Sequence, residues 1–270
     1  MSAAEVPNGF ALVKERNELQ LRHTVLASRQ FLAPGYVRIR VTGSDLATFD
    51  SPGADDHARL IFPPAHVAGD EDPRQWSGRA YTPSDWNQAE EWAEFEFVIH
   101  GGPGTSVASE WAATAPLGSP LLIGGPRGSQ RFIGEPDSFF LAGDETAMPA
   151  IRRLVRYLAV DLGLPGTVAL ETGPRTAVSL VEATVGTQQE VVIAELERGN
   201  ETAAAPLIEH LDSLSSADRP AGNVFCFLGA EQSAVKAARA LFFDRWQVPA
   251  TQASIRGYWK AGVISFHDHG

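Results

Sequence analysis

Cysteine is nearly absent from this sequence, since Cys226 is the single one among 270 residues. One cysteine excludes a disulfide framework and a cysteine-rich metal site. Its position inside the apolar run NVFCFLG predicts a buried thiol that takes no part in chemistry. No apolar run reaches the ~20 residues of a membrane-spanning helix, and the N-terminus lacks the basic and apolar segments of a secretory signal. We therefore expect a soluble, cytoplasmic protein without membrane insertion.

Basic residues are in the minority. The sequence has 22 Lys and Arg against 33 Asp and Glu, which gives a formal net charge of -11. Such a charge excludes nucleic acid and anionic membranes as bulk partners, and an anionic small molecule would need a local basic pocket. The seven histidines are scattered, and His267 and His269 in the tail FHDHG have too few following residues to enclose an ion. The sequence therefore predicts no metal site.

The first half of the chain consists of short runs of alternating polarity. From Leu19 to about Ile133, segments such as YVRIRVTG, ARLIFPP, EFEFVIHGG and SPLLIGGP are separated by glycine and proline. Many short strands with turn signals between them predict an antiparallel barrel or sandwich. One helix, over 106–115, is expected to interrupt these strands.

The second half has a different rhythm, which begins after residues 134–138. Continuous apolar strands over 139–143, 167–173, 190–197 and 223–229 are accompanied by helical patterns over 147–160 and 232–245. Buried strands that alternate with helices indicate a parallel sheet covered on both faces. The predicted fold is thus an antiparallel β-barrel over 1–135, followed by a parallel-sheet α/β domain over 136–270.

The motif RAYTPS, residues 79–84, offers three groups suited to a nucleotide cofactor. The fork of Arg79 matches a phosphate, the ring of Tyr81 matches an aromatic plane, and the hydroxyl of Thr82 can bond to a ring nitrogen or carbonyl. An ordinary amphipathic strand is the alternative interpretation of so short a match.

A glycine-rich loop opens a helix at HGGPGTSVASEWA, residues 100–112. Exposed backbone N–H groups at the start of a helix attract anions, so a pyrophosphate could bind there without a basic side chain. A turn capped by Ser106 or Ser109, with no ligand, is the alternative.

The stretch FFLAGDETAMPAI, residues 139–151, predicts a strand, a turn and a helix. Gly143 is expected to break the strand and allow a tight turn. Thr146 is placed to cap the helix through its hydroxyl, and Pro149 fits the first turn. Nucleotide-binding turns at this place usually carry several glycines, whereas this one carries Asp144 and Glu145. These acids would disfavour a phosphate packed directly against them, so the turn is not expected to hold a phosphate itself.

Seven segments occur in the order found in one family. They are SPGADDHARLIFP, RAYTP, FVIHG, ASEWA, GGPRGS, LAGDETAMPAI and GYWKAG. Over about residues 16–262 the chain resembles the siderophore-interacting proteins, which are FAD-dependent ferric-siderophore reductases of the ferredoxin-reductase superfamily. The resemblance implies FAD on the barrel and NADH or NADPH on the α/β domain. It also implies that electrons pass to chelated Fe³⁺, which is released as Fe²⁺.

The resemblance also suggests which residues contact each group, and it implies no obligatory catalytic acid or base. The residues expected to contact FAD are Arg79, Tyr81, Thr82, His100, Gly101, Ala108, Ser109 and Trp111. Those expected to contact the nicotinamide cofactor are Gly143, Asp144, Glu145, Thr146, Pro149, Phe227 and Glu231. Those expected to form a basic pocket for an anionic ferric siderophore are Arg59, Arg127, Arg131, Arg256 and Lys260.

Two departures from the family pattern leave alternatives open. Ser84 stands where the family usually has an arginine, and FLGAE, residues 227–231, replaces a Trp-x-Ala-Gly-Glu motif. The same fold could serve a flavin reductase, or an electron-transfer protein with a ferredoxin as partner. A siderophore- or flavin-binding protein without turnover is a third interpretation. The sequence does not distinguish NADH from NADPH, or one siderophore from another.

Overall fold

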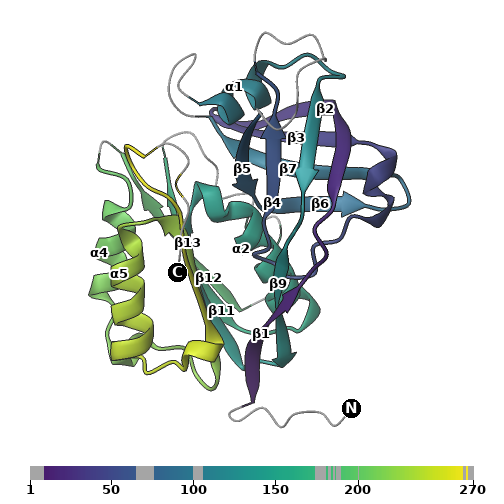
Figure 1. The fold of residues 1–270 in the computed structure, drawn as a ribbon. Coiled ribbons are helices and arrows are strands. Elements are labelled where there is room, and N and C mark those ends of the chain that lie inside the picture. The colour runs from purple at the N-terminus through teal and green to yellow at the C-terminus, as the bar shows by residue number, and fades with distance from the viewer. Residues whose placement is uncertain are drawn as a thin grey trace. The chain divides into compact units, whose positions relative to one another are not determined.

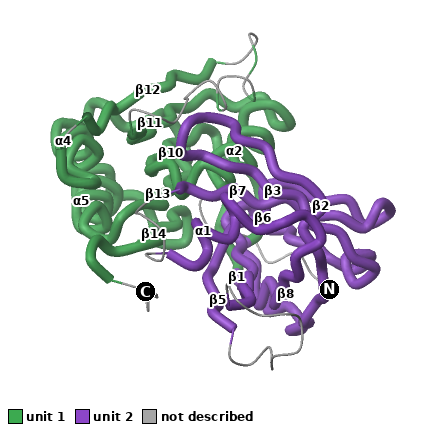
Figure 2. Tube along the Cα trace, turned by 90° about the horizontal axis from the view of Figure 1, so that it is seen from above, with its two compact units in different colours: residues 1–13, 131–270 green, residues 14–130 purple. Residues whose placement is uncertain are grey.

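A computed structural model describes residues 9–64, 76–99, 106–173, 190–199 and 201–263, and positions 181, 184, 186 and 266. The chain forms two compact units (Figure 2). One comprises residues 14–130, and the other comprises residues 1–13 and 131–270. The predicted functional domains, 1–135 and 136–270, stay a prediction. Within the described residues, no helix is long and apolar enough to span a bilayer.

The unit over residues 14–130 is built on a curled antiparallel sheet of seven strands, in the order β5-β4-β8-β2-β3-β7-β6 (Figure 1). Helix α1 (Val107–Thr114) packs on this sheet, and a 3₁₀ turn covers Ser44–Thr48. The strands are β2 (Leu21–Ala33), β3 (Tyr36–Thr42), β4 (Ala58–Phe62), β5 (Ser77–Tyr81), β6 (Pro83–Asn87), β7 (Trp92–Val98) and β8 (Pro120–Gly124).

Alternation along the strands explains this sheet. In β3, Val37, Ile39 and Val41 are fully buried in the core, while Arg38 and Arg40 project from the opposite face. Those arginines form ion pairs with acids of the neighbouring strand β7. Each fully buried aliphatic side chain contributes about 1.5–3 kcal/mol to stability. The predicted antiparallel architecture is confirmed.

The second unit is built on a parallel sheet of five strands, in the order β12-β11-β10-β13-β14. In Figure 1, α2 covers one face of the sheet, and α4 and α5 cover the other. The strands are β10 (Ser138–Asp144), β11 (Gly166–Thr172), β12 (Val191–Glu197), β13 (Val224–Glu231) and β14 (Ala253–Trp259). The α-helices are α2 (Met148–Val155), α4 (Ala205–Ser213) and α5 (Ala234–Arg239), and 3₁₀ turns cover Glu145–Ala147, Ser216–Asp218 and Ala250–Gln252.

Every residue of β10 and β13 is buried, as continuous apolar strands predict. Phe140 and Cys226 belong to the core cluster that includes Leu207 of α4 and Ala238 of α5. Burial raises the pKa of the Cys226 thiol far above its usual value. The prediction of a buried cysteine is therefore confirmed.

The structure extends the predicted elements in three ways. Both long helical patterns begin as α-helix and end as wider π turns, at Arg156–Asp161 and Ala240–Arg245. Strand β14 adds a fifth parallel strand to the sheet, where the sequence had suggested only a family-like segment. A separate two-stranded sheet pairs β1 (Phe10–Arg16) with β9 (Gly128–Gly134).

Candidate functional site

Tyr81 lies in an aromatic cluster at the end of β5. Its ring centroid is 4.3 Å from that of Phe97 and 6.4 Å from that of Phe62. The ring of Trp111, from α1, lies 5.5 Å from Phe62 on the same cluster. Burial raises the pKa of the Tyr81 hydroxyl, and the nearby Arg79 charge only partly offsets this shift. The phenol is therefore neutral. The sheet and α1 thus bring two predicted flavin contacts, Tyr81 and Trp111, to one place.

Arg79 lies two residues before Tyr81 on β5 and is half-buried. Its Nη1 donates to the carbonyl oxygen of Gly78 at 2.9 Å. A guanidinium has five N–H donors, so most of the Arg79 fork can still bind a phosphate. Thr82, the next predicted contact, is 7% exposed.

The start of α1 is capped by Ser106. The Ser106 side chain accepts from the N–H of Ser109 at 3.4 Å, while the Ser109 hydroxyl donates to the carbonyl oxygen of Val98 at 3.1 Å. Ser109 therefore ties the helix to β7, and Ala108 beside it is buried. The other two predicted flavin contacts, His100 and Gly101, lie outside the described residues.

Two buried polar atoms near Tyr81 have no hydrogen-bond partner among the described residues. They are Oγ of Ser84 and Nε1 of Trp111. Buried polar atoms are normally paired, so this hydroxyl and this indole N–H are each able to form a hydrogen bond with a polar ligand. Together with Arg79 and the Tyr81 ring, these groups fit an aromatic cofactor that carries phosphate, and FAD is such a cofactor.

The role of Gly143 differs from the one expected. Strand β10 continues through Gly143 to Asp144, so the glycine does not break it. A Cβ atom at Gly143 would lie 2.6 Å from the carbonyl oxygen of Gly229 and 2.9 Å from Cβ of Ala147. The position therefore requires glycine because β13 and the first turn after β10 pack against it, not because of a tight turn.

Asp144 connects three segments of the second unit. Its Oδ1 accepts from the backbone N–H of Thr146 at 2.9 Å and from the Thr146 hydroxyl at 2.5 Å. Its Oδ2 accepts from the backbone N–H of Glu231 at 2.9 Å and from Nε1 of Trp259 at 2.8 Å. Burial, with the neighbouring Glu145 charge, raises the pKa of Asp144 to about 6, and the hydrogen bonds from Thr146 and Trp259 oppose this shift.

This arrangement corrects the prediction that Thr146 caps the helix. Asp144 is the N-cap of the 3₁₀ turn Glu145–Ala147, and α2 begins at Met148 without a side-chain cap. A carboxylate is a stronger acceptor than a hydroxyl, so Asp144 accepts from the backbone N–H of Thr146, and the Thr146 hydroxyl itself donates to Asp144. Pro149 lies in the first turn of α2, as predicted.

Glu145 forms an ion pair with Arg198, a residue that sequence reasoning missed. Nη1 and Nη2 of Arg198 bond to the two Glu145 oxygens at 3.0 and 2.6 Å, and Nε bonds to Glu171 at 2.5 Å. Glu171 also accepts from the N–H groups of Ala204 and Leu207, at the start of α4. Although burial alone would lower the pKa of Arg198, the hydrogen bonds that it donates to Glu145 and Glu171 raise it. The carboxylates of Asp144 and Glu145 thus both bond to other groups of the protein.

Glu231, at the end of β13, is held in a similar way. Its Oε2 accepts from the N–H and the hydroxyl of Ser233, and its Oε1 accepts from the N–H of Ala261 at 3.1 Å. Although burial opposes ionisation, these bonds and the nearby Lys260 charge lower the Glu231 pKa. Phe227 is fully buried within β13, so its surroundings would have to open before it could stack on a nicotinamide ring.

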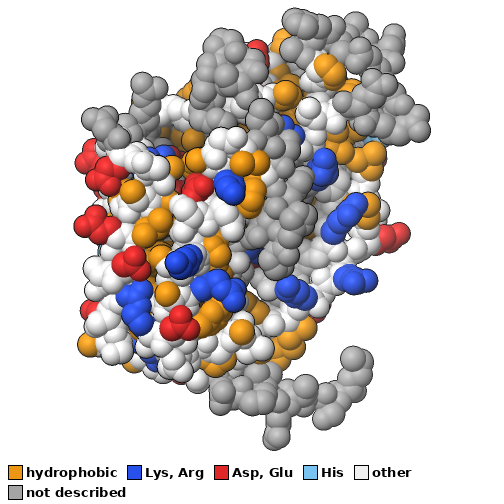
Figure 3. Space-filling view, turned by 60° about the vertical axis from the view of Figure 1, so that its left-hand side comes forward, with side chains coloured by type: hydrophobic (Ala, Val, Ile, Leu, Met, Phe, Trp, Pro, Cys, Tyr) orange, Lys and Arg blue, Asp and Glu red, His pale blue; other side chains and the backbone are white. Residues whose placement is uncertain are grey.

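The five predicted siderophore-binding cations are divided between the units, and their assignment stays a prediction. Arg59 and Arg127 are exposed and belong to residues 14–130. The side chain of Arg59 lies against the backbone of Gly78, where an added Cβ would be 2.2 Å from Nε of Arg59. Figure 3 shows Lys and Arg side chains spread over one face, some beside Asp and Glu side chains and others amid apolar and uncharged surface.

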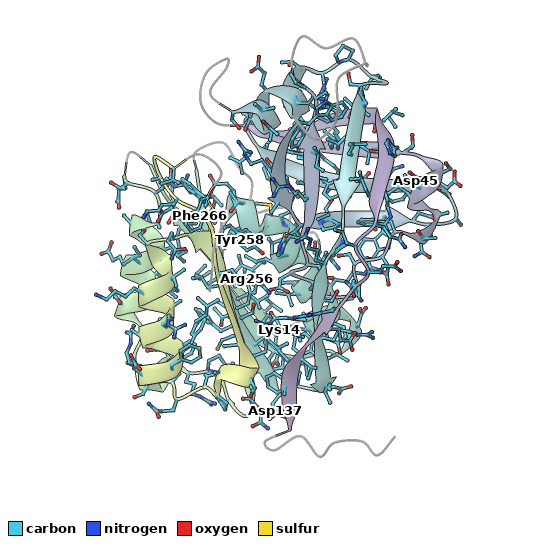
Figure 4. The ribbon with its side chains drawn as sticks, viewed as in Figure 1. Lys14, Asp45, Asp137, Arg256, Tyr258 and Phe266 are labelled. Atoms are coloured by element: carbon cyan, nitrogen blue, oxygen red, sulfur yellow. The ribbon has the colours of Figure 1, made fainter. Side chains whose placement is uncertain are left out.

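The other three cations, Arg131, Arg256 and Lys260, belong to the second unit. Figure 4 shows Arg256 and Tyr258 on the same strand, β14. Lys260 follows that strand and is exposed. Within the part of the chain that the structure describes, no group of His, Cys, Asp and Glu side chains is placed to hold a metal ion.

Comparison with known families matches both halves of the chain. Residues 25–130 match the siderophore-interacting FAD-binding domain, and residues 136–262 match the siderophore-interacting protein family. FAD is thus the cofactor that this type of barrel binds, in agreement with the groups around Tyr81.

Two curated relatives show similarity to the chain. An NADPH-dependent ferric-chelate reductase of Escherichia coli is 35% identical over 157 residues, which cover 53% of this chain and 59% of that protein. The ferric vibriobactin reductase ViuB of Vibrio cholerae is 25% identical over 246 residues, which cover 87% of each chain.

A solved structure supports the same relationship. The crystal structure of a siderophore utilization protein from T. fusca superposes with a TM-score of 0.79 at 26% identity. The superposition covers 96% of this chain and 100% of that one. The order of the motifs, the two family matches and this shared architecture agree, and the chain belongs to the siderophore-interacting protein family.

Proposed function

We propose that the protein is an FAD-containing, NAD(P)H-dependent reductase of ferric siderophores that acts in the cytoplasm. The observation that carries the proposal is the group of residues around Tyr81, on a barrel of the FAD-binding type. Arg79 offers donors there, and Ser84 and Trp111 each offer an unpaired polar atom. The reductase names of the E. coli and V. cholerae relatives support the same activity.

The barrel residues would bind and orient the cofactor. Arg79 would hold phosphate through its remaining N–H donors, and the Tyr81 ring would pack against an aromatic plane. Ser84 and Trp111 would gain the hydrogen-bond partner that neither has among the described residues. When bound, FAD supplies the redox chemistry, since it can accept a hydride and give up electrons one at a time.

The turn after β10 would contact the nicotinamide end of NADH or NADPH. The carboxylates of Asp144 and Glu145 are engaged by Thr146, Trp259 and Arg198, so they orient the turn and leave ligand binding to other groups. The Thr146 hydroxyl donates its hydrogen bond to Asp144, which leaves its oxygen lone pairs to accept a hydrogen bond from a carboxamide or a ribose hydroxyl.

Iron would enter as a complete chelate. The described residues supply no metal-ligand cluster, and electron transfer to Fe³⁺ does not require the protein to coordinate it. Exposed cations such as Arg59 and Lys260 would attract an anionic complex at short range, in spite of the net charge of -11. Fe²⁺ binds the hard oxygen donors of a siderophore less tightly, so reduction would release it.

An anaerobic two-step assay tests the proposal. The FAD-loaded protein is mixed with NADPH or NADH while the flavin absorbance is followed, and a ferric catecholate siderophore is then added with a colorimetric Fe²⁺ trap. Loss of the flavin band in the first step should be followed by its return and by stoichiometric Fe²⁺ in the second. A flavin that NAD(P)H does not bleach would indicate a binding protein without turnover. A bleached flavin that the ferric chelate does not reoxidise would indicate another acceptor, such as a ferredoxin.

A further inference from the structure

Lys260 lies between two residues that are anchored to the end of strand β13. On one side, the carbonyl oxygen of Trp259 accepts from the N–H of Gln232 at 2.8 Å. On the other side, the N–H of Ala261 donates to Oε1 of Glu231 at 3.1 Å. The carbonyl of Lys260 itself accepts from the N–H of Val263 at 3.0 Å. The backbone of this exposed lysine is therefore fixed, although its side chain is long and flexible.

A β-bulge gives Trp259 its position. The pairing of β13 with β14 shifts after Ala230 and Gly257, so that Glu231 lies opposite Trp259 rather than Tyr258. A bulge redirects the side chains that follow it. The Trp259 indole reaches the buried Asp144 carboxylate, and its Nε1 donates to Oδ2 at 2.8 Å.

The indole bond is a strong point of attachment. Asp144 is 1% exposed, and the same Oδ2 accepts from the N–H of Glu231 at 2.9 Å. Hydrogen bonds to a charged acceptor are stronger than those between neutral groups. Without the indole N–H, the end of β14 would keep its main-chain bonds but lose its side-chain attachment to the sheet.

We propose that Trp259 is a positioning residue for Lys260: its indole, bonded to Asp144, adds a side-chain attachment to the backbone from which the lysine ammonium meets an anionic ferric chelate. The inference rests on the proposed function, because it concerns the contribution of Lys260 to the same chelate site. The backbone of Lys260 is then already ordered before the chelate binds, so less conformational entropy is lost when the complex forms.

The test compares Trp259→Phe, Lys260→Ala and the double variant in steady-state reduction of an anionic ferric catecholate by NADPH. Phenylalanine keeps an aromatic ring and removes the N–H donor. Each single variant should raise the KM for the chelate by about threefold or more, the effect expected for one hydrogen bond or one local charge. The double variant should have the KM of Lys260→Ala alone, because Trp259 acts through the lysine and coupled residues are not additive.

Trp246→Phe is the matched control. Trp246 also donates through Nε1, to the carbonyl oxygen of Ser215 at 2.8 Å, but it is buried in the core cluster of α4 and α5. It should lower the melting temperature and leave the chelate KM unchanged. Ala261→Pro provides a second test without altering the packed indole, since it removes the N–H that bonds to Glu231, and it should also raise the KM.

Three outcomes would overturn the inference. In one, the fold increase in KM of the double variant equals the product of the fold increases of the two single variants, which would mean that Trp259 acts independently of Lys260. In another, Trp259→Phe and Ala261→Pro both reduce the chelate with the parental KM. The inference would then be wrong, but the proposed function would stand. The last is a parent protein that reduces no ferric chelate although NADPH bleaches its flavin, in which case the proposed function fails first.

Discussion

The guanidinium of Arg198 forms two parallel hydrogen bonds with the Glu145 carboxylate, at 3.0 and 2.6 Å, and a third bond with Glu171. Both carboxylates are buried. Arg198→Met should therefore lower the free energy of unfolding by about 3–5 kcal/mol, because it leaves two buried charges without their cation. Urea unfolding measures the loss. The control is Arg239→Met at an exposed position of α5, which should change stability by about 0.5 kcal/mol or less.

Asp144 should make stability depend on pH. Its pKa in the folded state is about 6, above the ordinary value of 3.8, so the native state holds its proton more tightly than the unfolded state does. The resulting stabilisation is fully present below pH about 4 and is lost as the pH rises through 6; a displacement of this size corresponds to roughly 3 kcal/mol.

Comparison with Asp144→Asn isolates this effect. Asparagine does not titrate, so the unfolding free energy of the parent minus that of the variant should decrease between pH 4 and pH 7. Urea titrations at four pH values in that range measure the difference. A difference that stays constant with pH would mean that Asp144 ionises at its ordinary pKa.

Thr146→Ala tests whether the turn after β10 contacts the nicotinamide cofactor. The substitution removes the hydroxyl that bonds to Asp144 at 2.5 Å, and it should slow anaerobic flavin reduction by NADPH roughly twofold to tenfold. Thr146→Ser keeps the hydroxyl and should react at nearly the parental rate. Melting and stopped-flow reduction are measured on the same samples. If the alanine variant melts earlier but reduces flavin at the parental rate, the turn serves structure alone.

The elements that could be predicted from the sequence are those with strong periodicity. The alternation of Val37, Ile39 and Val41 with arginines is typical of a sheet with one buried face, and continuous apolar runs such as 139–142 are typical of a parallel strand. Strand β9 contains GSQRFIG, whose polar and exposed residues carry no such pattern. It forms because it can pair with β1, a partner more than 100 residues distant in sequence.

The candidate site was harder to predict because its interactions are non-local. The roles expected for Gly143 and Thr146 were based on neighbours in sequence, whereas the structure shows that Gly229 and Asp144 determine them. Arg198 was missed because a lone arginine after a strand looks like any surface residue. The signal was the presence of two acids, Glu145 and Glu171, at the carboxyl ends of adjacent parallel strands, since buried acids need a partner.

Arg79→Ala should weaken FAD binding. A charge-assisted contact with phosphate contributes ~1.5–3 kcal/mol, so the Kd should rise by roughly 10- to 100-fold. Titration of the apoprotein with FAD, followed by quenching of flavin fluorescence, measures the change. Arg40→Ala is the control on the same sheet, because its guanidinium is engaged by Glu94 and lies over the Trp92 ring. An unchanged Kd for Arg79→Ala would place the phosphates elsewhere.

Charge reversal at Arg59 or Arg127 tests whether an anionic ferric chelate binds through a local basic pocket. The net charge of -11 opposes such a ligand, but screening over a Debye length of ~8 Å at physiological salt hides distant acids while leaving groups in contact effective. Arg59→Glu and Arg127→Glu should each raise the KM for an anionic ferric siderophore several-fold. They should leave the reduction of a neutral acceptor, and flavin reduction by NADPH, nearly unchanged.

Arg239→Glu changes the net charge by the same amount at an exposed position of α5, and it should have little effect on any of the three reactions. If this control raises the chelate KM as much as the other two variants do, the chelate responds to the overall field of the protein, and neither Arg59 nor Arg127 belongs to its site.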